Sequence, residues 1–416
     1  MKDKDMAIAL LAVKDEESWI TFDYIASQTG YSKRQLIRMS KNRYQGTMTP
    51  TASHPNPIPH NKASGSEIEY LVQMKAKYPD ITIAQFRDIY IEDVIYNSDK
   101  AAEVFENQLK PRSYTWFRNL FRNLGWESIK PRKTRKRDNR AAHPLREPSP
   151  QRGMIIQIDG TPYDWLHTGE NWTLHLAVDD ATTEVLAGWF FPTERQLGYC
   201  IIMRKIILEH GIPEAIYSDK HTIFKSKNEY GITQFGMMMD DLGITMLYAN
   251  TAPAKGRVER YNGTLQGRLP NDIIRFGIRS YDELNTWVND FYIKYINRKF
   301  SFRPKSEIPA FVEFDPSTAD LNWIFSLRVE KTIKNDMFSF ENKYYCLYEN
   351  EDSTSRIHVI NGTKIKVRYC VFNSKVYAYR SGLKYVCKVV AERRRSNSEL
   401  LENAKDVLDY LSGSRK

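Results

Sequence analysis

The spacing of hydrophobic positions changes along the chain, and each change marks a different kind of element. In residues 6–43 apolar side chains recur every three or four positions, which predicts helices. A stretch rich in Pro, Ser and Thr at 44–64 predicts an extended linker. The helical period then returns in four further stretches, at residues 66–78, 82–94, 101–108 and 113–124.

The middle of the chain predicts a mixed α/β layer arrangement. Short apolar runs bounded by turn residues predict strands at 154–158, 172–178, 185–191, 215–218 and 244–248. Amphipathic stretches predict helices at 196–210, 234–242, 254–268 and 281–297. Three strands in succession, followed by alternating helices and strands, favour one sheet that is covered by helices.

The last part of the chain has the periodicity of β-strands. Residues 325–392 alternate between apolar and polar with a period of two, and turn signals interrupt them near 341–343, 361–362 and 373–374. This pattern predicts a small all-β barrel or sandwich. The basic run 393–395 then opens a stretch with a helical pattern.

Composition narrows the class of protein. The chain has 416 residues, of which 41% are hydrophobic and 27% charged, which is typical of a soluble globular protein with two to four domains. There is no apolar run of membrane-spanning length and no signal-peptide pattern, so we expect a cytoplasmic protein. The cysteines lie too far apart in sequence for zinc or redox pairs, and we expect them to be small buried hydrophobes: Cys200, Cys346, Cys370 and Cys387.

Net charge favours a polyanionic partner. The chain carries a formal charge of +10, and its basic residues concentrate in residues 130–140. Such a run is often a solvated linker, but here it lies where a strap along DNA phosphates would be useful. The members for which we expect a DNA contact are Arg132, Lys133, Arg135, Lys136 and Arg137.

The first helical block fits a helix-turn-helix. Ala26 is small where two helices would cross, Gly30 permits a sharp turn, and Leu36 seats the second helix. Ser32 would cap that helix. An ordinary helical hairpin is the alternative. On the helix-turn-helix interpretation, the side chains facing DNA are Lys33, Arg34, Gln35, Arg38 and Lys41.

The second helical block also has a candidate DNA surface. Its last helix, 113–124, carries aromatic residues at helical spacing, which we expect to form the core of a small domain. The polar side chains around them would face DNA, and these are Arg112, Tyr114, Arg118 and Arg122.

Three acidic residues suggest the chemistry of the middle domain. Asp159 and Asp219 each end an apolar run that predicts a strand, and Glu259 lies in the first turns of a later predicted helix. Residues placed in this way can converge at one edge of a sheet. Carboxylates held together suit two Mg²⁺ or Mn²⁺ ions that clamp a phosphodiester. This constellation predicts an enzyme that cuts and joins DNA.

Four segments carry a resemblance to a known family: residues 157–160, 174–182, 217–220 and 254–269. The stretch 154–270 resembles the catalytic core of DDE transposases and retroviral-type integrases. It is most similar to bacterial insertion-sequence transposases of the ISNCY type and their relatives near the phage Mu transposase. The resemblance implies a ribonuclease H-like fold in which Asp159, Asp219 and Glu259 are the catalytic, metal-binding triad.

The resemblance also implies an activity and partners. Such enzymes bind the terminal inverted repeats of their element with N-terminal helix-turn-helix domains. They hydrolyse the phosphodiester at the 3′ ends and join the 3′-hydroxyl to target DNA by two-metal-ion transesterification. They act on double-stranded DNA as homo-oligomers, dimers or higher. The family also carries a small β-barrel after the core, which residues 325–392 fit.

The chain departs from the family pattern at one DNA contact. Many members carry a basic residue seven positions after the glutamate, where this chain has Gln266. Lys255 or Arg268 could take over that contact. Arg257 and Arg260, beside Glu259, are further candidates for a DNA contact.

Other acidic residues and two histidines compete for roles at the site. We expect Asp179 and Asp180 to stabilise a turn, and His175 to be a partly buried histidine with satisfied hydrogen bonds. His221 follows Asp219 closely and could touch DNA. The remaining acids are explained by their place in a loop or at the end of a helix, namely Glu229, Asp240 and Asp241.

These patterns divide the chain into eight segments. They are a helix-turn-helix DNA-binding domain at 1–45, a linker at 46–64, a second helical DNA-binding domain at 65–128, a basic linker at 129–150, the ribonuclease H-like α/β catalytic domain at 151–300, a connector at 301–324, the small β-barrel at 325–392 and a basic helical tail at 393–416. Two other functions fit part of the pattern. One is a sequence-specific DNA-binding regulator with an inactive nuclease-like core, and the other is a nuclease for RNA–DNA hybrids, against which the N-terminal modules argue.

Overall fold

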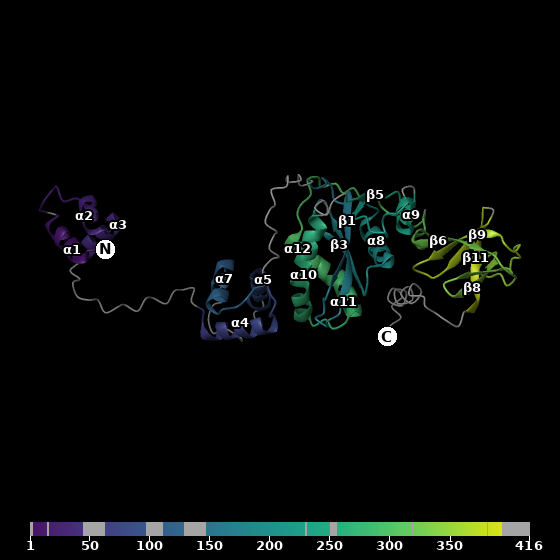
Figure 1. Ribbon diagram of the computed structural model, residues 1–416, viewed down its shortest axis with the longest axis horizontal. Coiled ribbons are helices and arrows are strands. Elements are labelled where there is room, and N and C mark those ends of the chain that lie inside the picture. The colour runs from purple at the N-terminus through teal and green to yellow at the C-terminus, as the bar shows by residue number, and fades with distance from the viewer. Residues whose placement is uncertain are drawn as a thin grey trace. The chain divides into compact units, whose positions relative to one another are not determined.

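The structure of the protein is a computed structural model that describes residues 3–14, 16–44, 63–96, 111–128, 147–228, 231–249, 256–317, 319–380 and 382–392. The chain divides into two compact units. One contains residues 1–73 and 102–108, and the other contains residues 74–101 and 109–416. Figure 1 labels many of their helices and strands. Among the described residues no helix combines the length and the apolar character that a membrane span needs.

The first unit begins with three helices, as the helical period in residues 6–43 predicts. They are α1 (Lys4–Val13), α2 (Phe22–Thr29) and α3 (Lys33–Tyr44). Gly30 ends α2 with a φ of 70°, a left-handed conformation that favours glycine. The Ser32 hydroxyl accepts from the backbone N–H of Gln35, which confirms the predicted cap. Their shared core consists of Ala7, Leu11, Ile20, Ile25 and Leu36.

The second helical block contains α4 (Gly65–Lys77), α5 (Ile83–Tyr90), the π-helix η1 (Ile91–Ile95) and α7 (Tyr114–Asn123). The two units divide within α4. Phe86 of α5 meets Phe117 and Phe121 of α7 edge to face, at centroid distances of 5.8 and 5.2 Å. The aromatics of α7 therefore form a core, as predicted. The helix predicted at 101–108 lies outside the described residues.

A five-stranded mixed sheet forms the centre of the second unit. Its strands are β1 (Ile155–Tyr163), β2 (Trp172–Asp179), β3 (Val185–Phe191), β4 (Ala215–Ser218) and β5 (Thr245–Tyr248). They lie in the order β3-β2-β1-β4-β5, with β1 antiparallel to β2 and parallel to β4. All the strands predicted for this region are present, but the first continues to Tyr163, so the prediction that Asp159 ends a strand is wrong. The arrangement is compatible with the ribonuclease H-like core that the resemblance implies.

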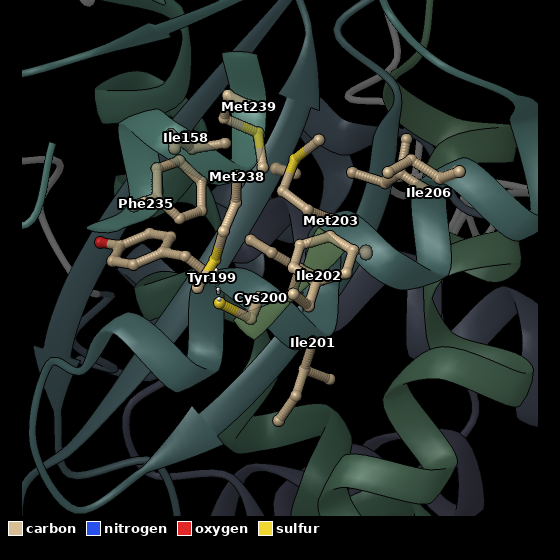
Figure 2. Packing of buried hydrophobic residues seen from close by; sticks show 14 of the residues in the cluster. Ile158, Tyr199, Cys200, Ile201, Ile202, Met203, Ile206, Phe235, Met238 and Met239 are labelled. Atoms are coloured by element: carbon tan, nitrogen blue, oxygen red, sulfur yellow. Dashed lines mark hydrogen bonds between the residues drawn. The ribbon is translucent and has the colours of Figure 1, made fainter. Parts of the chain in front are cut away.

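Helices cover both faces of this sheet (Figure 1). On one face lie α8 (Gln196–His210) and α9 (Gln234–Asp241). On the other lie α10 (Gly256–Phe276), α11 (Tyr281–Trp287), the π-helix η3 (Val288–Tyr292) and α12 (Ile293–Phe300). Two separate apolar clusters result, one on each face. Figure 2 shows the first, where Tyr199 and Met203 of α8 pack near Met238 and Met239 of α9.

The predicted end of one helix is wrong. The sequence predicts a helix at 254–268, whereas α10 continues to Phe276 and contains Pro270 in its interior. Proline removes a backbone donor and disfavours a helix. Leu269 and Ile273 are buried in the cluster beneath α10, and this packing outweighs the local preference.

The C-terminal part is all-β, but its strands form one open sheet. The strands are β6 (Ser326–Thr332), β7 (Met337–Phe340), β8 (Lys343–Tyr348), β9 (Lys364–Cys370), β10 (Val376–Arg380) and β11 (Leu383–Glu392), and the short helix α13 (Leu321–Ile324) precedes them. Their order is β6-β9-β10-β11-β8-β7. Since β6 and β7 stand at opposite ends of that order, the described residues form half of the predicted barrel. All the cysteines are buried and free, as expected.

Candidate active site

Two of the predicted acids lie on or directly after neighbouring strands. In the parallel pair of β1 and β4, Gln157 is opposite Tyr217. Asp159 lies two residues further along β1, and Asp219 directly follows Ser218, the last residue of β4. Ile156 and Ile158 point into the cluster beneath α8 and α9, so Asp159 projects toward the opposite face, where α10 lies.

Three side-chain hydrogen bonds attach α10 to β1 along this face. The Gln157 amide oxygen accepts from the backbone N–H of Val258 (3.1 Å), Asn262 Nδ2 donates to Asp159 Oδ2 (2.8 Å), and Gln266 Nε2 donates to Thr161 Oγ1 (2.9 Å). Glu259 follows Val258 directly and precedes Asn262 by less than one helical turn. Glu259 therefore lies on the part of α10 that is bonded to β1, and the Glu259 side chain is exposed.

A buried polar group fixes the start of α10. Gln157 is almost fully buried, and its amide nitrogen donates to Asp180 Oδ1. The Asp180 carboxylate also accepts from the backbone N–H of Ser149 (2.8 Å) and pairs with Arg257 (3.1 Å). Gln157 therefore joins β1, the turn after β2 and the first residues of α10. The sequence shows Gln157 only as part of the segment that carries Asp159, and its positioning role needed the structure.

A fourth carboxylate beside the triad was missed from the sequence. A Cβ built on Gly160 would lie 2.8 Å from both the carboxyl carbon of Glu194 and the hydroxyl of Tyr199. The Tyr199 hydroxyl donates to Glu194 Oε1 (2.6 Å). Burial, together with the charges of Glu194, Asp159 and Asp219, raises the pKa of Tyr199 well above its ordinary value. Tyr199 is therefore a protonated donor, and Glu194 lies in the irregular segment after β3, where no periodic pattern singles it out.

The chemistry of these donors fits a hard divalent cation, because Mg²⁺ and Mn²⁺ take carboxylate oxygens. The charges of Asp159 and Asp219 both contribute to the raised pKa of Tyr199, so both carboxylates lie within electrostatic range of that hydroxyl. In the part of the chain that the structure describes, however, no three His, Cys, Asp or Glu side chains are grouped closely enough to hold a metal ion. The structure thus supplies the ligand types without a closed three-ligand cage.

The competing residues have the structural roles predicted for them. Asp179 accepts from the backbone N–H groups of Gly153, Ala181 and Thr182, at 2.7 to 3.1 Å, and so stabilises the turn after β2. His175 is fully buried, and its ring nitrogens bond the backbone of Arg195 and Trp189. That burial lowers the pKa of His175 to about 4, so the ring is neutral.

The remaining competitors differ in how close they lie to the triad. The backbone N–H of His221 donates to Asp219 Oδ1 (2.9 Å), so His221 does lie beside the triad. Asp241 ends α9, as expected, and it also pairs with Arg328 of β6. Glu229 is outside the described residues.

The predicted DNA contacts of the helical domains lie mostly on exposed surfaces. On α3 the exposed side chains are Arg34, Gln35, Arg38 and Lys41, and Lys33 is exposed and pairs with Asp23 (2.6 Å). On α7 they are Tyr114, Arg118 and Arg122, while Arg112 stacks over Trp116 at 4.9 Å. The predicted contacts at Arg132, Lys133, Arg135, Lys136, Arg137 and Lys255 lie outside the described residues.

The arginines of α10 do not share one environment. Arg260 is exposed, and Arg257 is mostly buried against Asp180. Arg268 is buried, pairs with Asp88 of α5 (2.8 Å), and lies over the ring of Phe300 at 5.2 Å. In this structure Arg268 is therefore occupied within the protein and does not present its charge beside Gln266.

The sequence is similar to transposases over about half its length. Over 216 residues, 50% of this chain, it is 33% identical to the transposase for insertion sequence IS1202 of Streptococcus pneumoniae, of which the match covers 45%. Over 206 residues, 48% of this chain, it is 34% identical to y4bF of Sinorhizobium fredii, again covering 45% of that protein. The chain thus spans a little under half the length of these relatives. No family model matches it.

Solved structures give a weaker likeness. The HTLV-2 integrase catalytic core domain in complex with magnesium, in its trimeric form, is 22% identical, and the match covers 33% of this chain and 84% of that one with a TM-score of 0.27. The simian T-cell lymphotropic virus intasome in complex with the PP2A regulatory subunit B56 gamma is 15% identical, with coverages of 68% and 93% and a TM-score of 0.29. Superpositions this poor carry no argument. The sequence similarity confirms the predicted resemblance to insertion-sequence transposases.

Proposed function

We propose that this protein is a DNA transposase that cuts the ends of its own insertion sequence and joins them to target DNA. The observation that supports the proposal most is the attachment of α10, which carries Glu259, to β1, which carries Asp159. Asp159 lies on β1, Asp219 directly follows the neighbouring strand β4, and hydrogen bonds on either side of Glu259 attach α10 to β1. Similarity to the IS1202 transposase over half the chain supports the same activity.

The reaction we propose has two displacements at one site. In the first, water attacks the phosphorus at the 3′ end of the element, and the 3′ oxygen leaves as a free hydroxyl. In the second, that hydroxyl attacks a phosphodiester of the target, and a target 3′ oxygen leaves. Asp159, Asp219 and Glu259 would hold two Mg²⁺ or Mn²⁺ ions. When bound, these ions would increase the nucleophilicity of the attacking oxygen and stabilise charge on the leaving oxygen.

The residues around the triad have positioning roles in this proposal. Asn262 bonds one oxygen of Asp159 and thereby limits how that carboxylate can turn. Tyr199 holds Glu194 beside Gly160, which concentrates negative charge at the same end of the sheet. A divalent cation bound there would offset this negative charge.

We further propose that the two helical blocks bind the terminal inverted repeats. Exposed basic side chains on α3 and α7 would contact the DNA, with α3 acting as a recognition helix. A chain with two such blocks suits an end sequence with two parts. Joining both ends of an element in one event requires them to be paired, so we propose that the working form is a homo-oligomer, a dimer or higher.

The experiment that tests this function is cleavage of linear DNA carrying the element's ends, with Mg²⁺ or Mn²⁺. We expect Asp159→Asn and Asp219→Asn to abolish 3′ nicking while end binding survives, because each removes an anionic ligand and keeps the side-chain volume. Asp290→Asn is the matched control, since Asp290 is exposed on η3 away from these acids. Wild-type nicking by Asp159→Asn or Asp219→Asn would remove that residue from the triad.

A second candidate is a sequence-specific DNA-binding regulator with an inactive core. One observation favours it: no three-ligand metal cage is present among the described residues. In that case the wild-type protein would bind the ends tightly and leave them uncut with either metal. An RNA–DNA hybrid in the same assay distinguishes a nuclease for hybrids, which would cut the hybrid in preference to the end DNA.

A further inference from the structure

A hollow of about 410 Å³ lies beside the first turns of α10. Arg260, Tyr261 and Thr264 of that helix line it. These positions lie on the opposite side of α10 from Glu259, Asn262 and Gln266, because successive residues are turned by about 100° around a helix. The hollow is thus separated from the triad by the width of one helix.

The opposite wall is held in place by backbone hydrogen bonds. It is formed by the segment that leaves α12, including Phe300, Phe302 and Arg303. The backbone N–H of Phe302 donates to the carbonyl of Thr182 (2.7 Å), and the Thr183 hydroxyl donates to the carbonyl of Phe300 (3.0 Å). The hollow is therefore built into the fold and needs no ligand to form it.

The walls carry excess positive charge. Arg260, Arg303 and Lys305 line the hollow and are all exposed. Among its lining residues, Asp180 is the carboxylate, and it is fully buried and already paired with Arg257. Glu147 offsets Lys305 at an exposed position (3.1 Å). The charges of Arg260 and Arg303 remain to attract an anion such as a phosphate.

Two hydroxyls in the walls lack hydrogen-bond partners. Ser149 and Tyr261 are only 6% and 7% exposed, and among the described residues neither Ser149 Oγ nor Tyr261 Oη has a partner. Buried polar atoms are normally paired, because leaving one unpaired is costly. Two such atoms in the lining of one hollow indicate that it takes a ligand with polar groups of its own.

The hollow also offers an aromatic ring to that ligand. Phe302 is 70% exposed, which is unusual for a large apolar side chain, and it lines the hollow next to Arg303. An exposed aromatic ring beside cationic side chains is the arrangement on which unpaired bases stack. The volume is near the lower end of the range for small-molecule sites, which suits one nucleotide and excludes a duplex.

We propose that this hollow binds a single unpaired nucleotide of the DNA substrate. Its base would stack on Phe302, its phosphate would face Arg260 and Arg303, and its polar groups would pair with Ser149 and Tyr261. The identification of the nucleotide as part of a DNA substrate rests on the proposed function. One strand would then run around the start of α10, with one nucleotide held on the side away from the triad.

The first test uses the full chain and end DNA that carries 2-aminopurine in an unpaired overhang. Stacking on Phe302 quenches this base, so we expect quenching on binding to the wild type. Phe302→Ala and Arg303→Ala should lose the quenching and bind overhang DNA about tenfold more weakly, with blunt-end binding unchanged. The matched controls are Phe291→Ala and Arg279→Ala, at exposed positions of the same domain. Wild-type quenching in both hollow variants would overturn the proposal.

A second test separates this inference from the proposed function. Deoxyadenosine monophosphate at millimolar concentration should raise the melting temperature of the wild type but of neither hollow variant. If inorganic phosphate raised the melting temperature equally, and Phe302→Ala kept that rise, the hollow would be an anion site. The proposal of a bound nucleotide would then be overturned. No rise with the nucleotide and no quenching would overturn the proposal altogether. If the protein neither bound nor cut end DNA, the proposed transposase function would be rejected. The melting-temperature test with the nucleotide would still show whether the hollow binds it.

Discussion

Gly160 has no free space for a side chain. It follows Asp159 directly, and a side chain there would meet both Glu194 and Tyr199 at 2.8 Å. The glutamate could swing away, but Tyr199 is a fully buried residue of α8 and cannot. Gly160 thus lets a fourth carboxylate approach the strand that carries Asp159.

We therefore expect Gly160→Ala to reduce DNA nicking by a larger factor than its loss of folding stability explains. Overpacking at this position should lower the free energy of unfolding by about 1–3 kcal/mol. Displacing Glu194 from Asp159 should lower nicking by about tenfold or more. Gly267→Ala is the control, because a Cβ there meets no atom within 4 Å and alanine favours a helix. Equal nicking by the two variants would remove Glu194 from the site.

His175 predicts a pH dependence of stability. Its pKa falls from 6.5 in the unfolded chain to about 4 in the folded one, so the unfolded chain binds the proton first as pH drops. The contribution of the neutral ring is complete above pH 6.5 and is lost as pH falls toward 4, by on the order of 3 kcal/mol in total. Unfolding by urea across this range should show the loss.

The control for His175 is a comparison between variants. Burial raises the pKa of Asp179 and Asp272, whose contributions grow as pH falls, and it lowers the pKa of His210. The wild-type slope alone is therefore a sum of opposing terms. His175→Gln should be less stable at pH 7.5 and lose less between pH 6.5 and 4.5. An identical pH slope in both proteins would contradict the account.

Single residues divide sharply into those that the sequence predicts and those that it does not. Asp219 directly follows β4 and Glu259 lies in the first turn of α10, as local patterns predict, whereas Asp159 lies inside β1 and not at its end. Glu194 could not be found in this way, since its place depends on an irregular segment. The burial of Arg268 was missed for a related reason: its partner Asp88 lies far away in the sequence.

Among the elements, α10 decides the geometry of the site. Its position on β1 depends on Gln157, which is buried and bonds both Asp180 and the backbone of Val258. Truncating the Gln157 side chain to a methyl group would leave a cavity and two unpaired polar groups at the start of the helix.

Gln157→Ala should lower the free energy of unfolding by about 1–3 kcal/mol and reduce nicking by a larger factor than the lost stability explains. The reason is that Glu259 follows the residue that Gln157 holds. Gln266→Ala provides a comparison, because Gln266 also joins α10 to β1 but lies nearly two turns beyond Glu259. If Gln266→Ala reduced nicking as much as Gln157→Ala at equal stability, the special role of Gln157 would be rejected.

The sequence predicts the type and order of the helices and strands well, and it predicts their boundaries less well. The five strands of the central sheet are all found where apolar runs predict them. The expected end of α10 at residue 268 fails because burial of Leu269 and Ile273 carries the helix past Pro270. The expected barrel is half formed because closure depends on pairing of β6 with β7, which local alternation cannot predict.

In the molecule as a whole, the five-stranded sheet with the proposed catalytic residues belongs to one unit and the first three helices to the other. A single chain with one catalytic core would cut one strand at one end, so joining two ends calls for at least two chains. We expect mass photometry to find a complex of two or more chains only when paired end DNA is present. A complex that keeps one chain per end at saturation would contradict the proposed synapsis.

The central claim is that Asp159, Asp219 and Glu259 form one metal-dependent site for cutting and joining DNA. The most direct measurement is strand joining from a precut end into target DNA, with Mg²⁺ or Mn²⁺, by the wild type and by Glu259→Gln. We predict joined products from the wild type, none without metal, and none from Glu259→Gln, whose end binding should be unchanged. Joined products from Glu259→Gln, or wild-type protein that binds the ends and never joins them, would contradict the claim.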